Sequence, residues 1–276
     1  MNLFFNYVLV FGNWGFPALG VQGSAWATLF SRIFMATTML GFAGYEIWRE
    51  RIHFSWALLK PNYHSVTAIW GLGFPSAFQI LLEVGVFSVS TMLSSKFSAI
   101  SLAAHQVTLN LASLTFMIPL GISSATAVKM GESLGMGRRT QARNFGWMGL
   151  LMATTFMSVT AVLFFFFRSE VVSLYTSDTQ VIQMASGLML LVAFFQLFDG
   201  AQVALTGMFR GTGDTRTSMF VNLVGHWGLG FPLGLYFGFT KHLGVLGIWY
   251  GLTAGLVFVA IILFARWLWV AKNVLN

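Results

Sequence analysis

The sequence contains no cysteine and very little charge, and both shortages narrow the class of protein. None of the 276 residues is cysteine, so disulfide bonds and thiolate metal sites are excluded. Only 8% of the residues are charged, whereas soluble domains carry about a quarter. Hydrophobic residues make up 57%, and the mean hydropathy is +0.76. An ordinary soluble domain is therefore excluded, and the composition is typical of a membrane protein.

Long apolar runs recur along the whole chain. Runs of about 20 residues match the thickness of a bilayer when they are helical. We therefore predict an all-α membrane protein, a polytopic bundle of about eight transmembrane helices. The predicted spans cover residues 2–16, 21–48, 66–93, 102–128, 145–167, 181–209, 217–239 and 245–270.

The basic residues are distributed unevenly between the loops on the two sides. Lys96, Arg168 and Lys241 fall on one side of the predicted spans, and Arg32 lies within a span. The remaining basic residues all fall on the other side: Arg49, Arg51, Lys60, Lys129, Arg138, Arg139, Arg143, Arg210, Arg216, Arg266 and Lys272. By the positive-inside rule this side is cytoplasmic. We expect a multi-pass protein of the cytoplasmic membrane with both termini inside. The net charge of +7 is thus explained by topology, and no nucleic-acid partner is predicted.

The beginning of the sequence suggests an incomplete repeat. Fifteen residues of the first span would give a helix of about 22 Å, which is short for a hydrocarbon core of ~30 Å. The string LGVQG at 19–23 is similar to LGVLG at 243–247, and each opens the last span of a group. We expect residues 1–49 to be the last two spans of an incomplete first unit. Residues 50–65 are predicted to form a cytoplasmic connector, and residues 66–276 a complete unit of six spans.

Two carboxylates stand inside the apolar runs. A carboxylate at membrane depth costs roughly 2.5–3.5 kcal/mol on insertion scales, so it normally faces an aqueous cavity and acts on ions, protons or charged substrate. Glu83 has Gln79 one helical turn before it, and Asp199 has Gln196 and Gln202 three residues to either side. Each carboxylate therefore belongs to a polar stripe. We predict Glu83 and Asp199 as coupling residues for a cation or proton.

Other polar residues of the spans have two interpretations. The three glutamines, together with Asn110 next to His105 and Gln106, are candidates for the polar lining of a substrate cavity. They are equally expected as interhelical hydrogen bonds, worth about 0.6–2 kcal/mol each.

An enzyme is not predicted. The string GTGD at 211–214 is found in intramembrane aspartyl proteases, which need a second carboxyl at the same depth to share one proton. Asp214 lies between Arg210 and Arg216 in a loop and has no such partner, so we interpret the string as a turn. No metal-binding spacing occurs, and no cofactor is predicted.

Several motifs together carry a family resemblance. They are GNWGFPALGV at 12–21, ATLFSR at 27–32, GLGFP at 71–75, LAAHQV at 102–107, GESLG at 131–135 and RGTGDTR at 210–216. With these motifs in order, the chain resembles the multidrug and toxic compound extrusion (MATE) family of multidrug/cation antiporters over essentially its whole length.

The resemblance implies a twelve-helix transporter of two six-helix lobes, which exchanges organic cations for sodium ions or protons by alternating access. It implies that the missing helices of the first lobe belong to the same full-length chain. Glu83 and Asp199 match the acidic positions of helices seven and ten, where the sodium-coupled branch binds its ion transiently. Phe195 stands where that branch often has a tyrosine, so one oxygen ligand is missing.

Two alternatives remain open at this point. A lipid-linked saccharide flippase of the same superfamily would need several intramembrane arginines to hold pyrophosphate, and only Arg32 is available. A half-transporter without transport of its own also agrees with the short first span.

Overall fold

A computed structural model describes residues 1–49 and 62–275. The chain divides into two compact units, Met1–Ser65 and Val66–Asn276, which are considered separately below. The connector predicted at 50–65 falls largely outside the described residues. The elements in the described ranges are helical, as predicted from the apolar runs.

Residues 1–49 of the first unit form two helices and a turn. They are α1 (Asn2–Leu9), the 3-10 turn η1 (Asn13–Gly15) and α2 (Gly20–Arg49). The predicted span over residues 2–16 is thus α-helical only in its first half. Gly12, Trp14 and Gly15 have φ angles of 72°, 61° and 85°, and this left-handed backbone cannot continue an α-helix.

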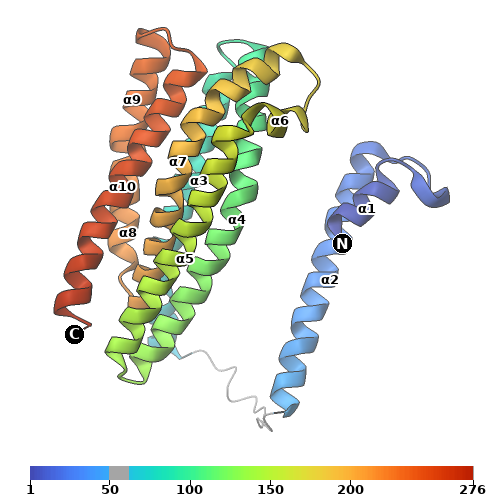
Figure 1. The fold of residues 1–276 in the computed structure, drawn as a ribbon. Coiled ribbons are helices and arrows are strands. Elements are labelled where there is room, and N and C mark those ends of the chain that lie inside the picture. The colour runs from blue at the N-terminus through green and yellow to red at the C-terminus, as the bar shows by residue number, and fades with distance from the viewer. Residues whose placement is uncertain (50–61, 276) are drawn as a thin grey trace. The chain divides into compact units, whose positions relative to one another are not determined.

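The second unit is a bundle of long helices (Figure 1). They are α3 (Tyr63–Ser94), α4 (Ala99–Gly135), α5 (Arg139–Phe166), α7 (Thr179–Thr212) and α10 (Val245–Asn273), with the short α6 (Arg168–Ser173) before α7. Each of these five long helices is long and apolar enough to cross a membrane. They coincide with the third, fourth, fifth, sixth and eighth predicted spans.

The seventh predicted span is an interrupted helix. It consists of the α-helix α8 (Thr215–Asn222), the π-helical segment η3 (Leu223–Gly230), the short α-helix α9 (Phe231–Leu235) and a second π-helical segment η4 (Tyr236–Thr240), which follow one another directly. Pro232 at the start of α9 has no N–H to donate, so the regular ladder cannot pass through it. Widened π turns accommodate the lost bond, and the run still reaches from one end of the unit to the other.

Short turns with side-chain caps make successive helices antiparallel. The Ser98 hydroxyl accepts from the N–H of Ser101, and Asp178 accepts from the N–H groups of Gln180 and Val181. Asp214 caps α8 and also pairs with Arg266 at 3.7 Å, so the GTGD string is a helix-joining turn. The loop basic residues of this unit then gather mostly at the end where α4 and α7 finish and α5 and α8 begin.

Close helix packing holds the interior together. One apolar core surrounds Leu188 and Trp249, and a second surrounds Met208 and Trp267 towards the basic end. Helix α7 is central, since it packs against α4, α5 and α10. At Gly207 a β-carbon would collide with the side chain and backbone of Ser123, so only glycine lets α7 approach α4 so closely.

Candidate functional site

A cavity of about 750 Å³ lies between helices of the second unit. Its lining comes mainly from α3, α4 and α7, with Trp249 contributed by α10. Pockets of this size hold drug-sized ligands. Because α3 and α7 are antiparallel, the cavity extends along both, from Arg210 near the basic end to Thr91 near the other end.

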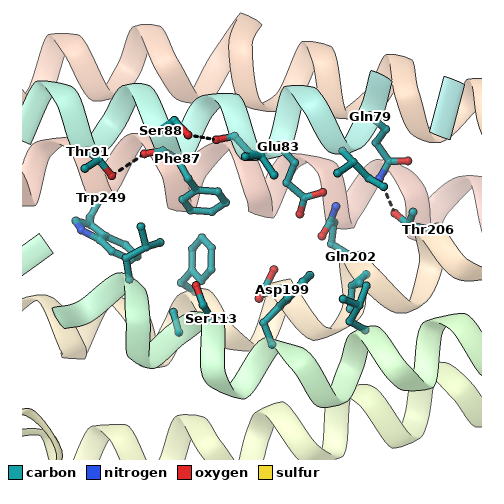
Figure 2. A pocket seen from close by; sticks show the side chains of 18 of the residues that line it. Gln79, Glu83, Phe87, Ser88, Thr91, Ser113, Asp199, Gln202, Thr206 and Trp249 are labelled. Carbon is teal, nitrogen blue, oxygen red and sulfur yellow. Dashed lines mark hydrogen bonds between the residues drawn. The ribbon is translucent and has the colours of Figure 1, made fainter. Parts of the chain in front are cut away.

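The two carboxylates face each other across this cavity. Glu83 on α3 is half-buried and Asp199 on α7 is 7% exposed, and both side chains point into the space between the helices (Figure 2). Within the described part of the chain, neither carboxylate forms an ion pair or accepts a side-chain hydrogen bond. Buried charge is costly unless it is paired or hydrated. The cavity is therefore well suited to bind a cation between the two groups.

Two of the predicted glutamines lie beside the carboxylates. The Gln79 amide on α3 donates to the Thr206 hydroxyl on α7 at 3.4 Å, which bridges the two helices one turn before Glu83 (Figure 2). The Gln202 amide donates to Oδ1 of Asn222 at 3.2 Å, while its own Oε1 is buried and has no partner among the described residues. An unpartnered oxygen next to Asp199 is an additional candidate ligand for a cation.

Sequence reasoning missed part of the polar lining. Thr206 and Arg210 both line the cavity, although the charge distribution in the sequence places Arg210 among the cytoplasmic loop residues. The signal was present in the spacing, because Asp199, Gln202, Thr206 and Arg210 follow one another at steps of three, four and four residues. Such steps place side chains on one face of a helix.

Aromatic side chains form the wall of the cavity away from Arg210. The Phe195 ring packs edge-on against Phe87 and Trp249, with ring centroids 6.3 and 5.8 Å apart. All three residues line the cavity. Aromatic faces attract cations by about 0.5–2 kcal/mol, so this wall can contribute to the binding of an organic cation.

Two predicted lining residues lie elsewhere. Gln196 is fully buried, and its Oε1 accepts hydrogen bonds from Thr115 at 3.0 Å and Thr160 at 3.3 Å. It therefore joins α7 to α4 and α5 outside the cavity lining. Asn110 is exposed on α4 and does not line the cavity either. Arg32, predicted to lie within a span, is exposed on α2 in the other unit.

The site offers oxygen ligands for a transported ion. The described residues contain no cluster of three or more His, Cys, Asp or Glu side chains that could hold a resident metal. Na⁺, like other hard cations, prefers oxygen ligands. The carboxylates of Glu83 and Asp199, the Gln202 Oε1 and the Thr206 hydroxyl are ligands of this kind, and Na⁺ would here be cargo and no cofactor.

The family model and the related proteins that match this chain all indicate the same family. Residues 75–236, which include both carboxylates, match the family model described as MatE. The chain is 34% identical over 272 residues to a probable multidrug resistance protein NorM of Mesorhizobium japonicum, covering 97% of this chain and 58% of that protein. It is 34% identical over 277 residues to the multidrug resistance protein MdtK of Yersinia pestis, covering 99% and 61%. The chain thus spans about three fifths of the length of these relatives.

Solved structures show the same fold. The chain matches the eukaryotic MATE transporter AtDTX14 with a TM-score of 0.84 and 24% identity, over 96% of this chain and 58% of that one. The Vibrio cholerae MATE transporter VcmN matches with a TM-score of 0.80 and 18% identity, over 99% and 60%.

Proposed function

The chain belongs to the MatE family of membrane transporters, and from this premise we propose that it takes part in exporting organic cations in exchange for Na⁺ or H⁺. Its relatives are multidrug resistance proteins by name, and members of this family are transporters and not enzymes. The cavity of the second unit is the proposed binding site.

Competition at the two carboxylates is the proposed coupling mechanism. Glu83 and Asp199 share one cavity, so a coupling ion and a cationic drug both lower the free energy of the same buried charges. Neither gains as much when the other is already bound. Entry of the ion from the outer side then displaces the drug outward, as the cavity alternates in access between the two sides of the membrane.

One observation supports this proposal more strongly than the other features of the cavity. Two carboxylates from different helices point into one mostly apolar cavity, and neither has an ionic partner among the described residues. Two buried acids used as structural contacts would be expected to pair with basic groups. Acids that remain open to a cavity are instead available to a cation that comes and goes.

The cavity also bears on the flippase alternative. A lipid-linked pyrophosphate needs several cationic groups, whereas Arg210 is the one basic residue among the lining residues, which include two acids. The charge balance therefore favours cations over polyphosphate. No contact among the described residues favours the alternative of a separate half-transporter.

We further propose that the basic end of the second unit faces the cytoplasm of the cell. Lys129, Arg138, Arg139 and Arg143 lie at or near this end together with Arg216, whereas Lys96, Arg168 and Lys241 lie at the opposite end. The positive-inside rule supports this orientation in a cytoplasmic membrane.

Cation binding to the purified chain tests the proposal directly. We expect ethidium, an apolar monocation, to bind the chain in nanodiscs and to be displaced by Na⁺ or by acidification. Glu83→Gln and Asp199→Asn should each weaken binding by about tenfold, a change of ~1.4 kcal/mol. Glu132→Gln is the matched control, because Glu132 is an exposed acid paired with Lys129 at 2.9 Å, far from the cavity lining. Equal affinity in all four proteins would refute the assigned roles of the carboxylates.

A further inference from the structure

His105 on α4 is completely buried and joins three helices through its two ring nitrogens. Its Nδ1 lies 3.1 Å from Nε1 of Trp249 on α10, and its Nε2 lies 2.9 Å from the hydroxyl of Thr91 on α3. The Thr91 hydroxyl in turn donates to the carbonyl of Phe87 at 3.0 Å. The Trp249 contact joins residues 144 positions apart, and the Thr91 contact joins the consecutive helices α3 and α4.

These contacts determine the proton position on the imidazole. The indole Nε1–H of Trp249 can only donate, so His105 Nδ1 must accept and carries no proton. The remaining proton of the neutral ring is then on Nε2, which donates to Thr91 Oγ1. A second proton on His105 would place two N–H groups against each other at the Trp249 contact. The network is therefore compatible with the neutral imidazole alone.

The partners of His105 belong to the wall of the cavity. Thr91 and Trp249 both line it, and Trp249 packs edge-on against Phe195. Helix α3, which carries Glu83, is joined to its neighbours by this network, by the Gln79–Thr206 bond and by a bond from Trp227 Nε1 to the Leu82 carbonyl at 2.9 Å. Loss of the His105 network would thus free the end of α3 opposite Arg210.

We propose that His105 is a positioning residue that, in its neutral form, fixes Trp249 and Thr91 in the cavity wall and releases Trp249 when it takes up a proton. The aromatic wall is ordered for an organic cation while the network is intact. Protonation breaks the Trp249 bond, loosens the contact between α4 and α10, and weakens cation binding. The effect on binding rests on the proposed function, whereas the effect on Trp249 does not.

The acid response of other titratable groups around His105 has to be distinguished from that of His105 itself. Glu83 on α3 and Asp199 on α7 face the same cavity and also respond to acid. Helix α10 carries the exposed Tyr250 and no charged residue before Arg266, and α4 carries none before Lys129. Lys96 in the turn between α3 and α4 is exposed. A variant that changes His105 alone and retains both carboxylates therefore isolates its contribution.

His105→Gln is that variant. A glutamine has one amide oxygen to accept from Trp249 and one NH₂ to donate to Thr91, so it can replace the neutral imidazole without titrating. The chain labelled with 5-fluorotryptophan gives one ¹⁹F resonance for each of its ten tryptophans, and Trp249→Phe identifies the resonance of Trp249. We expect this resonance to shift during an acid titration that protonates the buried imidazole in the unsubstituted chain, and to remain in place in His105→Gln.

Ethidium binding to the same proteins is the second measurement. Since one hydrogen bond contributes about 0.5–1.5 kcal/mol, acidification should weaken binding roughly three- to tenfold more in the unsubstituted chain than in His105→Gln. If His105→Gln does not fold, Trp249→Phe serves instead, because it removes the donor that conflicts with the charged ring and should abolish the additional acid effect. A Trp249 resonance with the same pH response in both proteins would overturn the proposal. A different outcome is that the Trp249 resonance shifts with acid in the unsubstituted chain and not in His105→Gln, while neither protein binds ethidium. This outcome would support the hydrogen-bond network and refute the proposed function.

Discussion

Helix α7 has two polar faces that look alike in the sequence and differ in the structure. Gln196 and Gln202 lie three residues to either side of Asp199. Gln196 is fully buried, with its carbonyl oxygen bonded to Thr115 and Thr160 on the packed side. Gln202 lines the cavity, and its Oε1 has no partner among the described residues. Each glutamine has one buried amide atom without a partner among the described residues, Nε2 in Gln196 and Oε1 in Gln202, so the free group does not distinguish them. The comparison teaches that the neighbouring helices, and not the residue type or its spacing, decide which glutamine meets the cavity.

The packed face should be the more sensitive to added volume. Gly207→Val would push a branched side chain into Ser123 and should destabilise the unit by about 3 kcal/mol, because well-packed interiors do not accommodate extra methyl groups. Gly187→Val is the matched control on the same helix, since a β-carbon there meets no atom within 4 Å. Thermal unfolding in detergent measures both. A Gly207→Val protein as stable as Gly187→Val would contradict the close packing of α7 on α4.

The cavity face should show coupling between its acids. If Glu83 and Asp199 bind the same cation, removing one leaves less for the other to contribute, so Glu83→Gln with Asp199→Asn should cost less than the two single losses combined. We expect an interaction free energy of about 0.5–3 kcal/mol in a double-mutant cycle of ethidium affinity. Additive losses would mean that the two carboxylates bind separate ions.

The two glutamines provide the most direct test of the comparison. Gln196→Leu removes hydrogen bonds from Thr115 and Thr160 and should lower the free energy of unfolding by about 1–2 kcal/mol, with ethidium affinity unchanged. Gln202→Leu should instead weaken ethidium binding about threefold, because it removes a cavity oxygen next to Asp199. Thermal unfolding and binding are measured on both variants. If the two substitutions have the same profile, the distinction between the faces is wrong.

Much of the fold was predictable because bilayer thickness imposes a length on every apolar run. The predicted spans over 66–93, 181–209 and 245–270 correspond to α3, α7 and α10. The first span failed at Gly12 and Trp14, where left-handed backbone ends the helix and hydropathy alone gives no warning. The π-helical turns around Pro232 were likewise invisible to an average over apolar residues.

The sequence predicts which residues share a face of one helix, but not which face of that helix meets the cavity. Spacing correctly put Gln79 on the face of Glu83, and both line the cavity. Gln196 and Gln202 are six residues apart, which separates them by about 120° around the helix, with Asp199 between them. Only the neighbouring helices decide which of the two meets the cavity. The bond between His105 and Trp249 joins residues 144 positions apart, and one sequence contains no signal for it.

Asn110 should show the smallest effect of all. Gln106, Leu109 and Ser113 line the cavity from α4, whereas Asn110, one turn after Gln106 at the edge of that stripe, is exposed and does not line it. Asn110→Ala should therefore change ethidium affinity less than twofold and the free energy of unfolding by no more than about 0.5 kcal/mol. Gln106→Ala on the same helix is the comparison, since it alters the lining itself and should change affinity more. A larger loss of affinity for Asn110→Ala would show that the cation also contacts the edge of α4 next to Gln106, so that the binding surface extends beyond the residues that line the cavity.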